Sequence, residues 1–282
     1  LGCGACVGAR SAARLGHRVP RHHDRDPGFL YQPIAEAQVN PVEETERALL
    51  NGDRVPGMAD FKVSTIIDVG TNTGQWVNEY IMDAGKYPDL KFVYCFEPHE
   101  KVFPYLEAHA KEHWTKQERV QVELYPYALG SPYKVQEDSF VRMDTANYCS
   151  SPLKPTRWLL ARSPDVADYT VVDVKYTSLD EAVQEFGMPL IDDVLLKIDT
   201  QGFEKAVLHG ALKTLQKVSW VQVEVMFDRL YEEQSTLHDL LEILEPAGFR
   251  YAGNTTQHGC PSSGAIMFAD ALFVRCPPRS KR

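Results

Sequence analysis

Two acidic positions in the second half of the chain stand where a carboxylate has a chemical use. Asp199 ends the apolar run 193–199, and Glu224 lies inside a second apolar run, 220–225. A carboxylate is costly to bury in a strand unless it is paired or takes part in chemistry. Two carboxylates that meet at one sheet edge could hold a proton for general-base work, or bind a divalent metal. We predict Asp199 and Glu224 as the catalytic residues and assign no metal.

Acids at these places also have ordinary structural uses, and other side chains could supply the base. Asp199 could cap a turn, and Glu204 could simply complement the dipole of the helix that it opens. His99 and His209 are reserve candidates for the base, although His209 falls late in an expected helix, where the dipole also favours a histidine. The Ser150-Ser151 pair could line an acceptor channel or belong to a polar loop.

A glycine-containing turn follows the first expected strand, with the sequence Gly70-Thr-Asn-Thr-Gly74. Glycines at such a turn let a ligand approach the backbone near the start of the next helix. The dinucleotide fingerprint requires Gly-x-Gly-x-x-Gly, whereas Asn72 stands at the second glycine position here. The spacing therefore argues against NAD and favours S-adenosylmethionine, which has no pyrophosphate. A turn that serves packing alone is the alternative.

The next two expected strands end in further candidate residues. Glu97 follows the strand 90–96, and an acid at this place in doubly wound folds holds ribose hydroxyls. A carboxylate can accept from both hydroxyls, although a surface Glu near a helix start is also common. After the third strand, Ala128 and Leu129 could line an adenine slot or form a tight turn.

Strands and helices alternate along most of the chain, which predicts a parallel α/β sheet with crossover helices. The expected strands are residues 63–69, 90–96, 119–124, 171–176, 193–199, 220–225, 248–251 and 269–275, and the expected helices are residues 75–84, 99–112, 178–186, 203–216 and 235–246. Residues 131–170 contain four prolines and no clean period. We expect them to pass over the carboxyl edge of the sheet, partly as a lid.

These motifs together resemble the FkbM-type S-adenosylmethionine-dependent methyltransferases. The resemblance runs through 67–74, 96–98, 127–130, 150–153, 178–180, 196–204, 223–225, 230–232, 248–249 and 270–274. Its most specific part is Lys197-Ile-Asp-Thr-Gln-Gly-Phe-Glu204, and Thr71 departs from it, because Ala is usual there.

The resemblance implies a class I methyltransferase (Rossmann-like) fold over residues 60–276: a doubly wound, mostly parallel sheet with an antiparallel C-terminal edge strand. It implies S-adenosylmethionine as the cofactor and transfer of a methyl group to a hydroxyl of a small molecule or sugar, with the acceptor itself left open. The cofactor site that it implies consists of Asp68, Gly70, Asn72, Gly74, Glu97, Ala128 and Leu129.

Charge is distributed unevenly along the 282 residues. The total is −9, while the first 30 residues carry +3 and residues 275–282 carry +4, which leaves −16 for residues 31–274. A body this acidic repels phosphate backbones, so nucleic acid is a poor substrate candidate. No apolar run of about 18 residues is present, so no transmembrane segment is expected.

The first 59 residues form a basic leader that the resemblance does not reach, and residues 277–282 form a basic tail. Residues 1–23 hold four Arg and no acid, a composition typical of an organelle transit peptide, so we expect a mitochondrial location, or otherwise a cytoplasmic one. A second hypothesis follows: an accessory structural subunit of a large mitochondrial assembly, respiratory or ribosomal, that keeps the methyltransferase fold and binds partner proteins through residues 1–30.

Residues 42–50 are expected to form a short helix. Two cysteines and two histidines within residues 3–22 loosely match a zinc pattern, but their loop is too short.

Overall fold

The computed structural model describes residues 62–132, 139–260 and 263–276. Its main sheet has seven strands in the order β10-β11-β9-β8-β1-β2-β3. These strands are β1 (Thr65–Val69), β2 (Phe92–Phe96), β3 (Gln121–Tyr125), β8 (Val194–Ile198), β9 (Val218–Met226), β10 (Phe249–Gly259) and β11 (Ile266–Arg275). Strands β1, β2, β3, β8 and β9 pair in parallel. Strand β11 lies between β9 and β10 and is antiparallel to both. The predicted α/β, doubly wound, mostly parallel sheet is confirmed, and its antiparallel C-terminal strand, β11, lies one place inside the edge that β10 forms.

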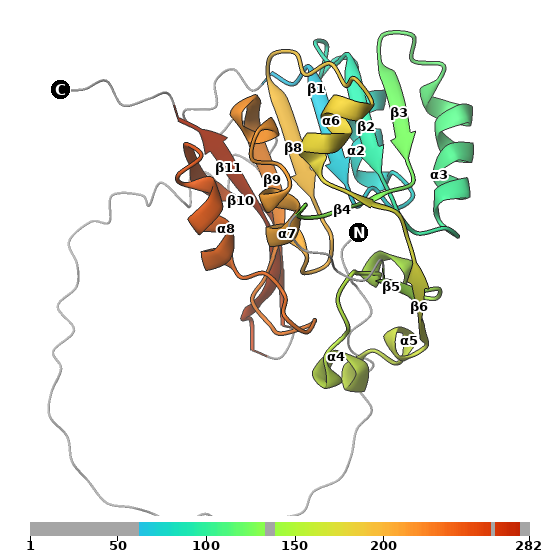
Figure 1. Cartoon of the computed structure of the whole chain (residues 1–282), viewed down its shortest axis with the longest axis vertical. Coiled ribbons are helices and arrows are strands. Elements are labelled where there is room, and N and C mark those ends of the chain that lie inside the picture. The colour runs from blue at the N-terminus through green and yellow to red at the C-terminus, as the bar shows by residue number, and fades with distance from the viewer. Residues whose placement is uncertain (1–61, 133–138, 261–262, 277–282) are drawn as a thin grey trace, which may run out of the picture.

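Helices cover both faces of this sheet because side chains alternate along each buried strand. The helices of the main body are α2 (Gln75–Met82), α3 (Phe103–His109), α6 (Leu179–Glu185), α7 (Glu204–His209) and α8 (Leu237–Leu244), with a π-helical turn at Ala110–Trp114 and a 3-10 turn at Thr214–Gln216. Ile66 and Leu195 pack in one hydrophobic cluster with α2 and α3. Ile67 and Leu196 pack in the other cluster with α6, α7 and α8, which lie on the near side of the sheet in Figure 1.

The segment between β3 and α6 leaves the main sheet and forms a small lobe beyond the carboxyl ends of the parallel strands (Figure 1). It contains β4 (Ala128–Leu129), β5 (Ser139–Met143), a 3-10 turn (Asn147–Cys149), α4 (Arg157–Arg162), α5 (Pro164–Ala167), β6 (Tyr169–Asp173) and β7 (Tyr176–Thr177). The excursion of the chain over this edge is as predicted.

The position predicted for one strand, residues 171–176, is wrong. The segment 171–176 was expected to continue the parallel sheet, but β6 pairs only with β5, and β7 pairs with β4. Val171 keeps 51% of its surface exposed, so this strand lacks the two buried faces that a central strand needs.

The C-terminal hairpin is longer than the sequence pattern indicated. Residues 248–251 were expected as a short strand, yet β10 continues to Gly259 and pairs with β11 along its length, interrupted by bulges. The far half of this hairpin is rich in polar side chains, and it reaches the carboxyl edge of the sheet.

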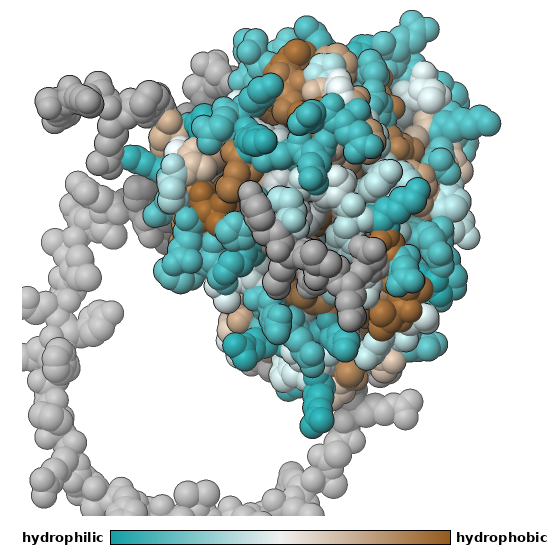
Figure 2. Space-filling view, viewed as in Figure 1, coloured by the Kyte–Doolittle hydropathy of each residue, from teal (hydrophilic) through white to brown (hydrophobic). Residues whose placement is uncertain are grey.

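The predictions for the leader (1–59), its helix at 42–50, its cysteines and histidines, and the tail (277–282) fall outside the described residues. None of the helices in the described part of the chain has the length and hydrophobicity to cross a bilayer. The face of the molecule seen in Figure 2 is mostly hydrophilic, with separate small hydrophobic areas.

Candidate active site

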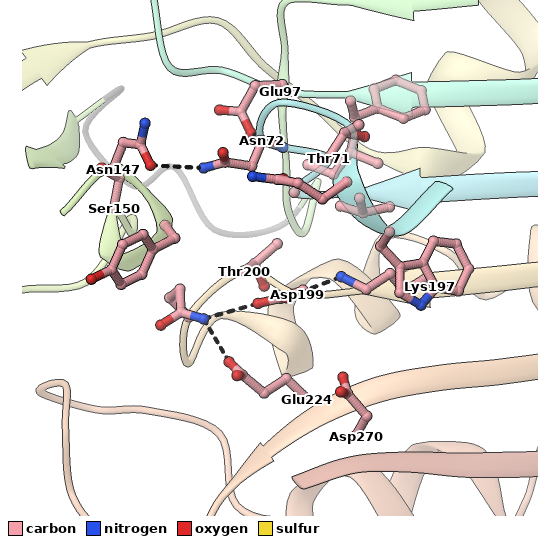
Figure 3. Close-up of a pocket in the computed structure, with 18 of the residues that line it drawn as sticks. Thr71, Asn72, Glu97, Asn147, Ser150, Lys197, Asp199, Thr200, Glu224 and Asp270 are labelled. Carbon is pink, nitrogen blue, oxygen red and sulfur yellow. Dashed lines mark hydrogen bonds and ion pairs between the residues drawn. The ribbon is translucent and has the colours of Figure 1, made fainter. Parts of the chain in front are cut away.

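A cavity of about 980 Å³ lies at the carboxyl edge of the sheet. Its walls come from the turn after β1, the ends of β2 and β8, the small lobe, and the β10–β11 hairpin. Figure 3 shows Asn72 and Glu97 on one side of it and Asp199, Glu224 and Asp270 on the other. Parallel strands produce this arrangement, because residues that follow neighbouring strands meet at the same edge.

The glycine turn brings the ends of β1 and β8 into close contact. Gly70 has a φ of +81°, and a Cβ atom there would lie 1.9 Å from the carbonyl oxygen of Asp199. Only glycine fits such an approach. Gly74, with a φ of +86°, is packed against the ring of Trp114 and precedes α2. The first glycine therefore sets the cavity wall, while the second sets the packing of α2 behind it.

Glu97 is tied into the backbone at the tip of β2. Its Oε2 accepts from the backbone N–H of Asn72 at 2.7 Å, and its Oε1 accepts from that of His99 at 2.8 Å. Burial raises the pKa of Glu97 to about 7, although both of these hydrogen bonds oppose the shift. Each carboxylate oxygen keeps a second lone pair, so the side chain can still accept from ligand hydroxyls.

Asp68 is fully buried at the end of β1, and neither of its carboxylate oxygens has a hydrogen-bond partner in the described structure. Burial raises the pKa of Asp68 to about 6. The charge of Lys197, which pairs with Asp68 from the neighbouring strand β8, opposes part of this shift. Asp68 and Gly74 do not line the cavity. The other predicted cofactor residues do: Gly70, Asn72, Glu97, Ala128 and Leu129.

The two predicted catalytic carboxylates meet at the cavity floor. Lys197 Nζ donates to Asp199 Oδ2 at 3.0 Å, and the Gln201 amide donates to Asp199 Oδ1 at 2.9 Å and to Glu224 Oε2 at 2.7 Å (Figure 3). Burial opposes ionisation of Asp199, but Lys197 and Gln201 outweigh it and lower its pKa. Burial and the neighbouring Asp199 charge raise the pKa of Glu224 well above its usual range. Asp199 is thus the ionised member of the pair, and Glu224 is the member that holds a proton.

Lys197 is fully enclosed between this pair and the helix α2. Burial opposes its charge, but Asp199 and Asp68 raise its pKa above the usual range. Its ammonium also lies 5.6 Å from the ring centre of Trp76. One buried cation therefore serves two carboxylates, the buried Asp68 and the partly exposed Asp199, which limits the cost of holding their charges at this place.

Glu204, the remaining acid of the most specific motif, has a structural role. Its Oε1 accepts from the Thr200 and Gly202 backbone N–H groups at 3.1 and 2.9 Å, and from the Thr200 hydroxyl at 3.2 Å. Burial raises its pKa to about 7. Glu204 thus holds the 199–204 loop in place below the cavity.

The reserve candidates lie elsewhere. His99 is buried outside the cavity lining, and His209 is exposed at the end of α7. Ser150 lines the cavity, whereas Ser151 is buried and donates to the Gln201 carbonyl oxygen at 2.8 Å. Within the described residues, no three or more His, Cys, Asp or Glu side chains are placed to hold a metal ion.

Sequence reasoning missed several residues of the site. Lys197, Gln201 and Asp270 line the cavity, and the carboxylate of Asp270 accepts from the Thr256 hydroxyl. A lysine inside the apolar run 193–199 was a usable signal, since a buried cation requires a carboxylate partner. No such signal marked Gln201, because its role depends on the fold of the loop.

Comparison with known proteins gives one family. Residues 68–251 match the model described as "Methyltransferase FkbM domain". A search of curated proteins finds no match.

Solved structures give more distant likenesses. The methyltransferase FkbM of Methylobacillus flagellatus KT has 14% identity and a TM-score of 0.44, with 83% of this chain and 50% of that chain covered. This chain thus spans half the length of that protein. The magnesium protoporphyrin IX methyltransferase of Synechocystis PCC 6803, solved with bound SAM, has 14% identity and a TM-score of 0.39, with 86% and 87% covered.

Proposed function

Because the chain belongs to the FkbM methyltransferase family, we propose that it uses S-adenosylmethionine to methylate a hydroxyl group of a small molecule. The cofactor of this family is S-adenosylmethionine, as predicted from the sequence. The observation that carries the proposal is that the tip of β2, with Glu97, faces the Asp199–Glu224 pair across one cavity.

The residues of the cavity fit S-adenosylmethionine. Glu97 retains acceptor capacity for ribose hydroxyls, and Ala128 and Leu129 provide an apolar wall. The helix α2 begins beside the cavity without a side-chain cap, so its first N–H groups can bind a carboxylate.

When bound, S-adenosylmethionine supplies an electrophilic methyl group on a positively charged sulfur. The work of this chain is to orient the acceptor hydroxyl and to take its proton. Glu224, in its ionised form, has the higher proton affinity of the pair and serves as the general base. Asp199 stays ionised beside Lys197 and can accept a hydrogen bond from a second hydroxyl of the acceptor molecule.

The charges around the cavity favour a neutral acceptor. Its lining carries five carboxylates: Glu79, Glu97, Asp199, Glu224 and Asp270. Lys197 is the one Lys or Arg among the described lining residues, and it is already paired with Asp199. Phosphorylated or carboxylated acceptors would be repelled at this site.

The far end of the cavity suits a compound with several hydroxyls. The hairpin contributes Asn254, Thr256 and Gln257 to the lining. The rings of His258 and Phe268, which also line the cavity, stack with their centres 4.5 Å apart. Amide and hydroxyl groups beside an aromatic surface provide both hydrogen bonds and apolar contact for a ring bearing hydroxyls.

The test is transfer of a labelled methyl group. The purified protein is incubated with S-adenosylmethionine carrying a labelled methyl group and with a panel of neutral sugars, polyols and phenols, beside their phosphorylated forms. We expect label in a neutral hydroxyl compound and none in its phosphorylated form. Label only in amines, or only in anionic acceptors, would contradict the proposal.

A further inference from the structure

The carboxylates of Asp199 and Glu224 share one donor, the side-chain amide of Gln201. Its Nε2 lies 2.9 Å from Asp199 Oδ1 and 2.7 Å from Glu224 Oε2 (Figure 3). One amide group has two N–H bonds, so each carboxylate receives one. This places the two acids at a fixed separation on the cavity floor.

The orientation of the amide is fixed from the other side. The Tyr231 hydroxyl lies 3.1 Å from Gln201 Oε1 and 2.7 Å from the carbonyl oxygen of Cys149. Since both partners are carbonyl oxygens, which only accept, the one O–H of Tyr231 is shared between them, with the shorter contact to Cys149. The oxygen of the Gln201 amide therefore faces Tyr231, and its nitrogen faces the two acids.

The backbone holds Gln201 as tightly as the side chain does. Gln201 has a φ of +54°, a left-handed conformation that a non-glycine residue adopts only when its surroundings require it. Its carbonyl oxygen accepts from the Ser151 hydroxyl at 2.8 Å, and Glu204 binds the N–H groups on both sides of it, at Thr200 and Gly202. Such strain at a loop beside a cavity is typical of a residue whose side chain must point in one direction.

We propose that Gln201, oriented by Tyr231, is a positioning residue that holds the carboxylates of Asp199 and Glu224 together on the cavity floor by giving one N–H bond to each. Its N–H bond to Asp199 acts together with Lys197 to keep the negative charge on Asp199. The proton then resides on Glu224. This inference rests on the proposed function, in which Glu224 is the general base and Asp199 accepts a hydrogen bond.

Other charged groups around Glu224 act in the same direction. Asp270 pairs with it across β9 and β11, Asp199 follows β8, and Glu204 opens α7, while Lys197 is the one cation that faces it among the described residues. Three acids against one cation favour a protonated Glu224. Lys197 distinguishes the two acids most directly, because its ammonium forms an ion pair with Asp199.

The experiment follows the two carboxyl groups themselves. Protein labelled with ¹³C at the Asp and Glu side-chain carboxyls is titrated by NMR without cofactor, and the two signals are assigned through their loss in Asp199→Asn and Glu224→Gln. The test variants are Gln201→Met, which removes the amide at nearly constant length, and Tyr231→Phe, which removes only the orienting hydroxyl. Gln121→Met and Tyr105→Phe, both at exposed positions, are the matched controls.

We expect Asp199 to titrate at higher pH in Gln201→Met, since its charged form has lost a donor, and to move in the same direction by less in Tyr231→Phe. Both controls should titrate like the parent. The proposal is overturned if Asp199 titrates in both variants as in the parent, including the case in which the variants differ from the parent only by a lower melting temperature. Because the titration needs no methyl transfer, a parent that titrates as expected but methylates nothing would contradict the proposed function and leave the role of Gln201 intact.

Discussion

Glu97 has two tasks at once, since it fixes the glycine turn through Asn72 and offers its remaining lone pairs to the cavity. We expect Glu97→Ala to weaken S-adenosylmethionine binding by roughly 1–3 kcal/mol, because the ribose hydroxyls lose their acceptor. That corresponds to a dissociation constant about 5- to 150-fold higher, measured by calorimetry. Glu107→Ala, at an exposed position of α3, is the control. Unchanged affinity in Glu97→Ala would refute the ribose assignment.

Glu224 is the residue on which the proton transfer depends. Glu224→Gln should lower the rate of methyl transfer by about 10²- to 10⁴-fold, the usual contribution of a general base, while cofactor affinity stays close to that of the parent. Because its pKa is raised, the rate of the parent should increase with pH through the range where Glu224 ionises. The exposed Glu232→Gln is the control. A Glu224→Gln enzyme as fast as the parent would remove this residue from the mechanism.

At the scale of residues, the sequence singled out two acids that the structure brings together, but not their partners, and the catalytic role of these acids stays a prediction. Asp199 and Glu224 were predicted because acids are costly inside apolar runs, and the structure brings them to one amide. Gln201 was not predicted, since its value comes from a left-handed backbone and from Tyr231, 30 residues away. Polar residues in loops carry no periodic signal, so only the fold identifies their partners.

Among the elements, α8 shows most clearly how local sequence sets stability. Thr236 accepts from the Asp239 N–H at 3.2 Å, and Asp239 accepts from the Thr236 N–H at 2.9 Å, which is a capping box. We expect Thr236→Ala to lower the free energy of unfolding by about 1 kcal/mol, as measured by urea denaturation. Thr145→Ala, at an exposed position outside helices and strands, is the control.

The effect of this cap should depend on pH. Lys205 and Thr236 lower the pKa of Asp239 to about 2. A depressed folded-state pKa gives stability that is present above the unfolded value near 4 and is lost as the pH falls through 2. The deficit of Thr236→Ala should therefore shrink between pH 4 and pH 2. A deficit that is constant over this range would contradict the role of Asp239 in the cap.

Element prediction succeeded where burial is continuous along a strand. The apolar runs of β1, β2 and β8 were visible because both faces of a central parallel strand are buried. It failed for residues 171–176 and for the far half of β10, where exposed and polar residues leave no such pattern. The far half of the hairpin, which forms one end of the cavity, was consequently not predicted.

For the whole molecule, buried acids set the pH dependence of stability. Burial raises the pKa of Asp68 to about 6 and those of Glu97 and Glu204 to about 7. Between pH 4.5 and 7 the folded state then binds more protons than the unfolded state, so stability falls as the pH rises. The buried His99, whose pKa burial lowers, opposes this in the upper part of that range.

We therefore expect the melting temperature of the cofactor-free protein to fall from pH 5 to pH 7.5. Glu204→Gln should flatten this slope because its side chain no longer ionises. A melting temperature that rises over the same range would show that these acids are not buried in solution. The mitochondrial location and the partner contacts of residues 1–30 stay predictions, since they depend on residues outside the described structure.

The central claim is that the cavity at the carboxyl edge holds S-adenosylmethionine, and titration calorimetry tests it most directly. The purified chain is titrated with S-adenosylmethionine and, separately, with its demethylated product. We predict saturable binding of both ligands at one site per chain, and competition between them for that site. A folded protein that binds neither ligand would contradict the claim.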